Sequence, residues 1–446
     1  MTWLTATEAL QVLRVRPQTL YANVSRKKIR AKPDPKDIRR SLYHEVDVRK
    51  LARKQGGRRK STVVAAGAIE WGDPVLSSAI STVVDGRLYY CGKDAVGLSD
   101  VATLEEVAGL LWGAGAVDFE QAWRHASAAM AGGGRKQAGR AQAATGGSRL
   151  TSGASAALSA AGGSGSVLTA RLGPRDNSTG IPLQRAFYAL GLRASADLSS
   201  YGRALPVLQA EAAGVLVTLA SALLGPESAA RAPGVVRVRQ SPADRPDYAL
   251  HERVADAFER SSAADILRRV LILLADHELN ASTFATRVAV STGAPLSAGV
   301  LSGLATLSGP LHGRAALGVL ELLASVERLG PDGAVRDWLS QGRPIVGFGH
   351  PLYPAGDPRA AALLQYLALP RAYTELSGVV EDMIGERPNI DFALAALTKV
   401  HRLPADAPLI LFALGRCAGW LAHALEQVTT GHPIRPRARY VGPAVS

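Results

Sequence analysis

The sequence predicts an all-α protein in which a small basic head precedes a long helical body. The chain has 446 residues, 47% of them apolar and 5% aromatic, which is enough for more than one packed domain. Beyond residue 65, Ala, Leu and Gly recur with helical periodicity, and Gly- and Pro-rich turns interrupt them. Residues 1–60 hold 17 Lys and Arg against 5 Asp and Glu, whereas the rest of the chain is nearly neutral, with 34 basic and 33 acidic residues.

The cysteines and the apolar runs restrict the setting that we expect for the protein. Cys91 and Cys417 are too few for a disulfide framework and lack the spacing of a metal site, so we expect no metal and a reducing, cytoplasmic location. No signal-peptide pattern is visible at the first residues. The apolar runs at 212–224 and 409–415 are shorter than a membrane span, which predicts buried helices and no membrane association.

The first 54 residues are predicted to form a winged helix-turn-helix domain. A first helix at 4–13 follows a threonine that is a candidate N-cap, and Pro17 opens a second helix that ends near residue 24. The basic segment 27–43 predicts a wing, and a third helix is expected at 46–54. Two short helices joined by three or four residues are typical of DNA-binding helix-turn-helix motifs.

The pattern of this head, LTATEAL…TLYANVSR…IR…Y…DV, resembles the MerR-type winged helix over about 55 residues. The resemblance implies that lysines and arginines neutralise phosphates while the second helix reads bases. The candidate DNA contacts are Thr19, Tyr21, Arg26, Lys27, Lys28 and Arg30. The alternative is a solvated basic appendage that only helps solubility or docks onto its own core.

The remainder of the chain is expected to be helical with functional loops. Residues 55–64 are polar and contain Gly, which predicts a linker. An Asp-Gly turn within 83–90 predicts one β-hairpin. The segment 126–173 is rich in Ala, Gly and Ser, and small-residue helices with long loops are expected there. From 252 to 425, helices alternate with Gly- and Pro-rich turns.

Three histidines and one aspartate lie in segments that are unlike ordinary surface helices. His277 belongs to a polar cluster at the end of an apolar helix, while His312 and His350 lie in Gly-containing loops. Asp391 lies between Ile and Phe, where desolvation would raise its pKa and make it a better base. Neutral histidines could donate hydrogen bonds to oxygens that become negative as a proton leaves carbon. The other six histidines, among them His423, are expected to be structural or solvated.

Three arginines suggest a polycarboxylate ligand. Arg416 interrupts an otherwise apolar helix, where a guanidinium is costly unless it meets an anion. Arg359 and Arg435 lie in Pro-containing loops, and several converging arginines fit a substrate with more than one carboxylate. The alternative for Arg416 is a pairing with a buried Asp or Glu.

The ordered motifs DHELNASTFATR, SGPLHG, VGFGH…DPRA, PNIDF, GRCAGWLAHALE and IRPRARYVG resemble the citrate synthase family across about residues 75–443. The resemblance implies an all-α homodimer with a large and a small helical domain, here within residues 65–446, and a mobile small domain at approximately 316–395. It also implies active sites at the junction of the two domains, with a contribution from the second subunit.

The resemblance assigns roles to the candidate residues. Asp391 would take a proton from the methyl group of acetyl-CoA, His312 would stabilise the enolate, and His350 would polarise the keto group of oxaloacetate. His277, Arg359 and Arg416 match ligands of the oxaloacetate and citrate carboxylates, and Arg435 matches the ligand supplied across the dimer. No metal or redox cofactor is implied, and CoA enters as the thioester substrate. Candidate CoA contacts are Arg314, Gly347 and Gly349.

Three departures from the family pattern concern the acyl-CoA side. Arg314 stands where a small residue usually follows the HG pair, Pro351 follows His350, and Pro354 replaces a residue that is often basic near the CoA phosphates. The motifs on the carboxylate side are intact, so the resemblance leads us to expect an enzyme that condenses acetyl-CoA with oxaloacetate and water to give citrate and CoA, the entry to the tricarboxylic acid cycle. The alternatives are a 2-methylcitrate synthase using propionyl-CoA, and a DNA-binding regulator that uses this core as a metabolite sensor and dimeriser.

Overall fold

The computed structural model describes residues 3–13, 24, 28–34, 37–56, 76–115, 117–126, 181–225, 248–438 and 440–443. These residues belong to two compact units, one of residues 1–77 with 436–446 and one of residues 78–435. Several sequence predictions lie outside the described residues, namely the second helix of the head up to residue 23, most of the linker, the Ala/Gly/Ser-rich segment from residue 127, and the candidates Thr19, Tyr21, Arg26 and Lys27.

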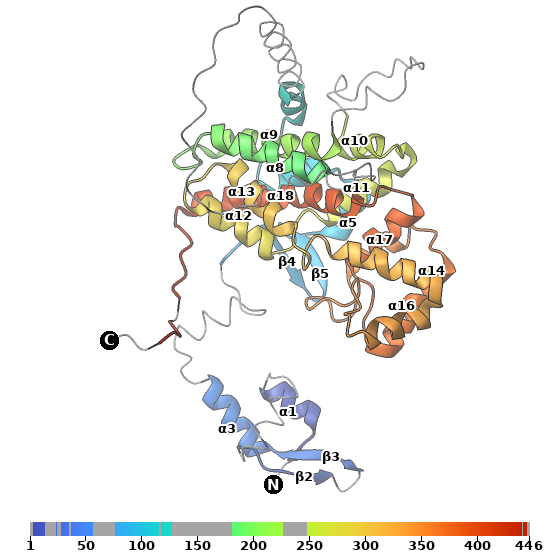
Figure 1. Cartoon of the computed structure of the whole chain (residues 1–446). Helices are drawn as coiled ribbons and strands as arrows, with labels where there is room; N and C mark the ends of the chain where they lie inside the picture. The colour runs from blue at the N-terminus through green and yellow to red at the C-terminus, as the bar shows by residue number, and fades with distance from the viewer. Residues whose placement is uncertain are drawn as a thin grey trace, which may run out of the picture. The chain divides into compact units, whose positions relative to one another are not determined.

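The first unit combines helices with a small antiparallel sheet (Figure 1). Helix α1 (Ala6–Leu13) begins at a capping box, in which Thr5 and Glu8 bond each other's backbone N–H groups. Strands β2 (Ala31–Asp34) and β3 (Asp37–His44) form a hairpin, and β1 (Trp3–Leu4) pairs with β3, so the sheet order is β1-β3-β2. Helix α3 (Glu45–Gly56) follows directly. The predicted first and third helices are confirmed.

The first unit has a small hydrophobic core that is separate from the core of the second unit. Among the described residues, five buried side chains form it: Ala9, Leu13, Ile29, Tyr43 and Val48, from the helices, the sheet and the turn before the sheet. Because apolar burial at about 25 cal/mol per Å² is the main stabilising term, this cluster supports a separate folding unit with a modest free energy of unfolding.

The second unit is mostly helical, as the sequence predicts, with one small sheet. The helices among the described residues are α5 (Ala95–Val101), α6 (Leu104–Leu111), α8 (Ile181–Ala196), α9 (Leu205–Leu224), α10 (Leu250–Ala257), α11 (Ala264–Leu273), α12 (Ala281–Ser291), α13 (Leu296–Leu307), α14 (Ala315–Ser340), α15 (Pro358–Leu364), α16 (Arg371–Ile384), α17 (Ile390–Val400) and α18 (Ala407–Thr430), with a short 3₁₀ turn at Ser261–Ala263. Figure 1 shows α18 between α8 and α9 on one side and β4 and β5 on the other.

Helix α18 is the central element of this unit. Nearly every residue from Ala407 to Leu425 is buried, and the helix packs against α9, α11, α12 and α13. A Cβ atom at Gly419 would lie 2.3 Å from the carbonyl oxygen of Ala275, so glycine is required for the close approach of α18 to the chain after α11. This approach fixes the distance between Arg416 and the His277 segment.

Two helices of the second unit, α9 and α18, have the length and hydropathy of a membrane span. The sequence prediction that their apolar runs are too short was wrong about length, because the helices extend beyond the runs to 20 and 24 residues. The apolar window of α18 is wholly buried by its neighbours and that of α9 is half buried. Core helices of folded proteins have the same properties.

The predicted hairpin is present and is anchored to the helices. Strands β4 (Ser81–Val84) and β5 (Arg87–Tyr90) are joined by Asp85 and Gly86, which both have positive φ, 50° and 71°. A short β6 (Lys93–Asp94) extends the sheet. The buried Tyr90 hydroxyl donates to the carbonyl of Ile272 at 2.9 Å, which ties the hairpin to the end of α11.

Helices α14, α16 and α17 pack together at one end of the second unit (Figure 1). Helix α14 is broken at Gly330, whose φ of 72° is followed by Pro331, so the element is two helices in sequence. His350 lies in the loop before α15, while Arg359 and Asp391 lie in the first turns of α15 and α17.

Candidate active site

His277 lies in the short connection between α11 and α12. Glu278 has a positive φ of 51°, and Asn280 begins α12 by accepting hydrogen bonds from two backbone N–H groups. The His277 ring is buried, with Nε2 2.8 Å from the hydroxyl oxygen of Tyr353. Burial lowers the pKa of His277 well below its ordinary value, and the charges of Arg359 and Arg416 lower it further. The imidazole is therefore neutral.

His312 lies in the loop between α13 and α14. A Cβ at the following Gly313 would lie 2.7 Å from the Leu307 side chain, so the tight turn that carries His312 needs glycine there. His312 Nε2 is 2.9 Å from Ser282 Oγ, and this oxygen accepts a hydrogen bond from Trp420 Nε1 at 3.1 Å. Burial, aided by Arg416, lowers the pKa of His312 to about 4, so this ring is also neutral.

His350 ends a glycine-rich segment that pairs with the loop before α17. Gly347 and Gly349 have φ of 85° and 72°, and Phe348 forms a β-bridge with Pro388. The backbone N–H of Leu352 donates to His350 Nδ1 at 3.2 Å, so a neutral His350 carries its proton on Nε2. Burial and the charge of Arg359 lower the pKa of His350 to about 4.

Asp391 lies in the first turn of α17. Asn389 caps the helix by accepting from the backbone N–H groups of Asp391 and Phe392. Asp391 Oδ1 is buried and has no hydrogen-bond partner among the described residues. Burial raises the pKa of Asp391 from 3.8 to about 6, against the opposing effect of Arg359. Such a carboxylate is a stronger base than an exposed one.

Arg359 is held in place by one carboxylate. Asp357 caps α15 and accepts from Nε and Nη2 of Arg359 at 3.0 and 2.8 Å, with both side chains buried. The second oxygen of Asp357 also accepts from the backbone N–H of Ile390 at 3.1 Å. Asp357 therefore links the arginine to the start of α17, next to Asp391.

Arg416 is buried, and no carboxylate of the described residues forms an ion pair with it. Its Nε donates to the carbonyl of Leu274 at 2.9 Å, and its Nη2 is buried with no partner among the described residues. Burial lowers the pKa of Arg416, and nearby Asp276 opposes this. The predicted alternative, a pairing with a buried Asp or Glu, is not what the described residues show. A buried guanidinium with a free N–H group is prepared for an anionic ligand.

These groups converge on one place. The ring centroids of His277 and His350 are 5.0 Å apart, and Tyr353 lies 5.5 Å from the first and 5.0 Å from the second. Arg359, Arg416, His350 and His312 are all close enough to lower the pKa of His277. The site thus contains two arginines and three neutral imidazoles, and the carboxyl group of Asp391 feels the charge of Arg359. Such a set can bind a polycarboxylate and move a proton.

The family model for the C-terminal domain of citrate synthase matches residues 195–437, which is more than half of the chain. The chain belongs to the citrate synthase family. Citrate synthase 2 of Bacillus subtilis is 37% identical over 238 residues, which are 48% of this chain and 63% of the relative. Citrate synthase of Haloferax volcanii is 40% identical over 191 residues, which are 40% of this chain and 50% of the relative. The alignments thus span about half to about two thirds of these curated relatives.

Solved citrate synthases share the fold over a longer part of the chain. The enzyme of Thermotoga maritima has a TM-score of 0.59 at 23% identity and covers 84% of this chain and 95% of its own. The enzyme of Thermoplasma acidophilum, solved as a ternary complex with carboxymethyl coenzyme A and oxaloacetate, has a TM-score of 0.57 at 20% identity and covers 85% and 97%. At these identities the likeness concerns the fold alone.

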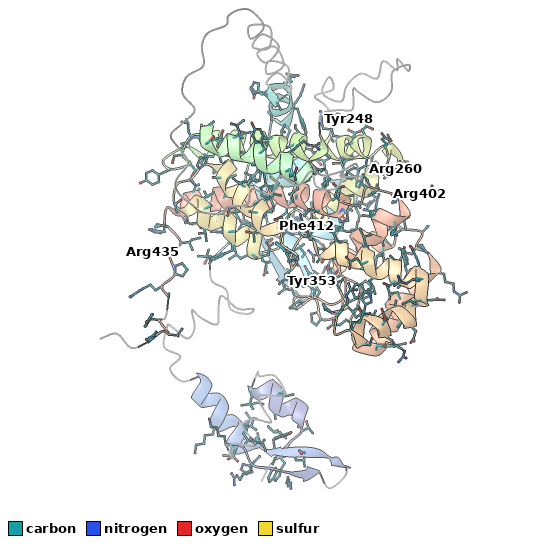
Figure 2. All side chains as sticks on the ribbon, in the orientation of Figure 1. Tyr248, Arg260, Tyr353, Arg402, Phe412 and Arg435 are labelled. Atoms are coloured by element: carbon teal, nitrogen blue, oxygen red, sulfur yellow. The ribbon has the colours of Figure 1, made fainter. Side chains whose placement is uncertain are left out.

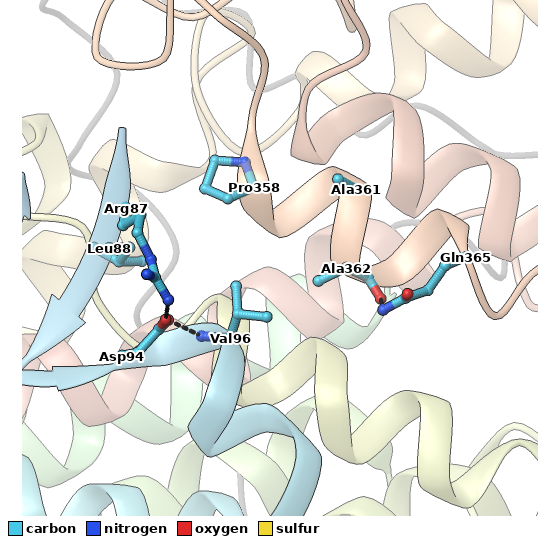
Figure 3. A pocket seen from close by; sticks show the side chains of 8 residues that line it. All are labelled: Arg87, Leu88, Asp94, Val96, Pro358, Ala361, Ala362 and Gln365. Atoms are coloured by element: carbon cyan, nitrogen blue, oxygen red, sulfur yellow. Dashed lines mark hydrogen bonds and ion pairs between the residues drawn. The ribbon is translucent and has the colours of Figure 1, made fainter. Parts of the chain in front are cut away.

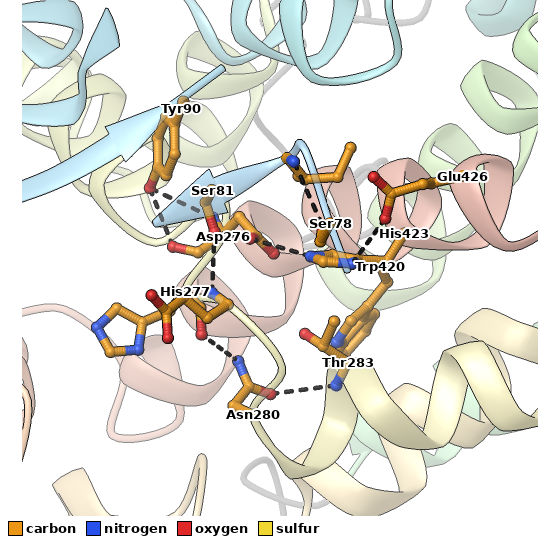
Figure 4. A network of polar contacts seen from close by, with 12 residues as sticks. Ser78, Ser81, Tyr90, Asp276, His277, Asn280, Thr283, Trp420, His423 and Glu426 are labelled. Carbon is orange, nitrogen blue, oxygen red and sulfur yellow. Dashed lines mark hydrogen bonds and ion pairs between the residues drawn. The ribbon is translucent and has the colours of Figure 1, made fainter. Parts of the chain in front are cut away.

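A buried polar network supports the site in this member of the citrate synthase family (Figure 4). The Asp276 carboxylate, fully buried, accepts from His423 Nε2 at 3.2 Å and from the Ser81 hydroxyl. On the other side of the ring, Arg287 is 3.2 Å from His423 Nδ1 and pairs with Glu426. The network holds the backbone just before His277 against β4 and α18, a structural role for His423.

Sequence reasoning missed four residues that position this site: Ser282, Tyr353, Asp357 and Asp276. The motifs contain Asp276, Ser282 and Asp357, whereas Tyr353 lies in the gap between VGFGH and DPRA. The site partners of Asp276, Ser282 and Tyr353 are distant in the sequence. Asp357 alone carries a local signal, because an Asp-Pro-Arg sequence at the start of a helix predicts an N-cap.

Other predicted residues lie apart from the cluster. Arg435 is exposed beyond the end of α18, and Figure 2 shows it well separated from Tyr353. Arg314 is exposed at the start of α14. In the head, Lys28 is exposed, whereas Arg30 forms a two-pronged ion pair with Asp47 at 2.7 and 2.9 Å. Across the described part of the chain, His, Cys, Asp and Glu form no cluster of three or more suited to a metal ion.

A cavity of about 340 Å³ lies between the hairpin and α15 (Figure 3). Its lining includes the ion pair of Arg87 with Asp94, and Pro358 from the start of α15. None of the candidate catalytic side chains lines it. The candidate active site therefore rests on the convergence of the histidines, arginines and Asp391, and not on this cavity.

Proposed function

We propose that the protein is a citrate synthase-type acyltransferase that condenses acetyl-CoA with oxaloacetate and water to give citrate and CoA. The observation that carries the proposal is Arg416, whose buried guanidinium has a free N–H group beside Arg359 and three neutral histidines. A dicarboxylate would satisfy this group and neutralise the excess positive charge. Asp391, with its raised pKa, supplies the base that the condensation needs.

The first step is removal of a methyl proton from acetyl-CoA by the Asp391 carboxylate. The electron pair moves to the thioester oxygen as the enolate forms, and His312 donates a hydrogen bond to that oxygen. Because the pKa of His312 is about 4, the ring is a neutral donor that stabilises the enolate without competing with Asp391 for the proton.

The second step is the attack of the enolate carbon on the keto carbon of oxaloacetate. His350 donates a hydrogen bond from Nε2–H to the keto oxygen and stabilises the alkoxide that develops there, since its Nδ1 already accepts from Leu352. Arg359, Arg416 and His277 hold the carboxylates. The alkoxide takes up one proton, which balances the proton that Asp391 removed. Water then attacks the citryl thioester carbonyl, the C–S bond breaks, and CoA leaves as the thiol with a proton that came from the water. These steps use the CoA thioester as a substrate and call for no metal or redox group.

Propionyl-CoA is the main alternative donor. A relative from Corynebacterium glutamicum named 2-methylcitrate synthase 1 is 33% identical over 203 residues, which are 42% of this chain and 52% of the relative. One additional methylene changes discrimination by only about 1–3 kcal/mol, so a few side chains near the acyl group decide it. The test is oxaloacetate-dependent thiol release with acetyl-, propionyl- and butyryl-CoA. No release with any of the three would contradict the proposed activity.

We also propose a homodimer in the cytoplasm. Helix α8 and the turn after it expose a row of large apolar side chains, each at least 60% accessible: Tyr188, Leu192, Leu198 and Tyr201. Exposed apolar patches of this kind mark interaction surfaces. Arg435, exposed and remote from its own chain's site, is then available to the partner subunit. Light scattering of the wild-type protein and Leu192→Asp tests this, with a dimer expected for the first and dissociation for the second.

DNA binding is a second candidate function, favoured by the charge of the head. The first 60 residues carry a balance of +12 on a unit with its own core and a hairpin between helices. Phosphate contacts of this kind give affinity that falls steeply with salt. The full chain should then bind duplex DNA with a steep salt dependence, and a chain that lacks residues 1–56 should lose it. Retained binding after truncation would contradict this function.

A further inference from the structure

Tyr353 touches three of the groups to which the proposed function assigns oxaloacetate. Its hydroxyl is 2.8 Å from His277 Nε2, its ring lies 5.0 Å from the His350 ring, and the Arg359 guanidinium lies 5.3 Å from its centroid. The side chain is 2% exposed. No step of the proposed mechanism uses this buried hydroxyl, although it lies among the groups that bind the anion.

The hydrogen bond between Tyr353 and His277 has one sensible direction. His277 Nε2 is the one polar partner of the Tyr353 hydroxyl among the described residues. If Nε2–H were the donor, the hydroxyl proton would be buried without an acceptor, which is unfavourable for a buried polar group. If the hydroxyl donates, Nε2 is the acceptor, and a neutral His277 carries its proton on Nδ1.

The loop that carries Tyr353 is built to hold it still. The backbone N–H of Tyr353 donates to the carbonyl of His350 at 2.9 Å, and that of Gly356 donates to the carbonyl of Tyr353 at 3.0 Å. These bonds close two successive β-turns, and Pro351 and Pro354 occupy the second position of each turn, where the fixed φ of proline fits. The two prolines that depart from the family pattern therefore restrain Tyr353.

We propose that Tyr353 is a positioning residue that fixes His277 in the tautomer with Nδ1–H, so that His277 is a hydrogen-bond donor to a carboxylate of oxaloacetate. The inference rests on the proposed function and deepens it, because it explains how a neutral histidine between two arginines binds an anion without gaining a proton. A donor held in the right tautomer costs no rearrangement when the substrate arrives. The raised pKa of Tyr353, about 12 because of burial, keeps the hydroxyl protonated at working pH.

The test compares Tyr353→Phe with Tyr373→Phe. Tyr373 is also buried, and its hydroxyl donates to Glu327 at 2.8 Å within the helices α14 and α16, so its loss is a matched control away from the site. Tyr353→Phe should raise the KM and the Kd for oxaloacetate about tenfold, which corresponds to about 1.4 kcal/mol, and change kcat by less than about threefold. Tyr373→Phe should change neither constant.

Nitrogen NMR of the imidazole rings in the ligand-free protein reports the tautomer of His277. A purely structural role for Tyr353 would leave that tautomer unchanged in Tyr353→Phe. The proposal expects His277 with Nδ1 protonated in the wild type and a mixture of tautomers in Tyr353→Phe, with His277→Gln used for assignment. An Nε2–H tautomer in the wild type, or equal oxaloacetate affinity in Tyr353→Phe, would overturn it. Failure of the wild type to bind oxaloacetate at all would instead overturn the proposed function, while the NMR result would still decide the tautomer.

Discussion

Replacing Asp391 with asparagine should make the protein more stable at neutral pH while removing its activity. The pKa of Asp391 is about 6 in the folded protein, compared with 3.8 for an unperturbed aspartate. The folded state therefore binds this proton more tightly than the unfolded state does, and stability falls as the pH rises from about 4 through 6. The side-chain amide of the Asp391→Asn variant does not titrate, so the substitution removes this pH dependence.

The magnitude follows from the two pKa values. Their difference corresponds to about 3 kcal/mol above pH 7, which falls to less than about 1 kcal/mol at pH 4. This value is an upper limit for the gain in the free energy of unfolding, because the asparagine amide must also be accommodated beside the unpartnered Oδ1 position. The cost of accommodating the amide is the same at every pH. It therefore does not change how the difference in the free energy of unfolding between the two proteins varies with pH.

The assay is urea unfolding of the wild type and of Asp391→Asn at several pH values between 4 and 8, without substrates. The difference in free energy of unfolding should grow in favour of Asp391→Asn as the pH rises, and level off above pH 7. The same variant should lose about 100-fold or more of its turnover, the usual cost of removing a general base. A stability difference that does not change with pH would refute the assignment of Asp391 as a buried base of raised pKa.

Three further substitutions test other parts of the site. Arg416→Met should abolish oxaloacetate binding. Calorimetry should find the ligand-free variant as stable as the wild type or up to about 3 kcal/mol more stable, because an unpaired buried charge is removed. A loss of stability would indicate that Arg416 has an internal partner. Gly419→Ala should lower the free energy of unfolding, measured with urea, by about 3 kcal/mol or more, since the added Cβ would lie 2.3 Å from a backbone oxygen. The control Gly378→Ala in α16, where a Cβ has open space, should leave the free energy of unfolding unchanged. Pro354→Arg should lower the KM for acetyl-CoA about threefold or more if a basic residue there reaches the CoA phosphates, and an unchanged KM would show that it does not.

Local patterns were enough to predict much of the fold. The Asp-Gly pair predicted the hairpin because both of its turn positions have positive φ, and the apolar periodicity predicted the helices. The lengths of α9 and α18 were underestimated, because small residues and isolated polar groups such as Arg416 continue a helix that tertiary packing stabilises.

The candidate site was predictable as a set of residue types, but its internal partnerships were not. His277 and Tyr353 are 76 positions apart, and Ser282 and His312 are 30 apart, so no local signal connects them. From the sequence, Arg416 was expected to bind either an anion or a buried acid. The structure distinguishes the two, because Nη2 of Arg416 has no partner among the described residues. Spacing within the chain carries no such information.

The measurement that tests the central claim most directly is the stoichiometry of the reaction. Purified protein is mixed with acetyl-CoA and oxaloacetate, the CoA thiol is titrated, and citrate is quantified by chromatography, with Asp391→Asn and His312→Ala as controls. We expect one citrate per thiol released, strict dependence on oxaloacetate, and a loss of about 100-fold or more in turnover in both variants. Thiol release without oxaloacetate, or no citrate, would contradict the central claim.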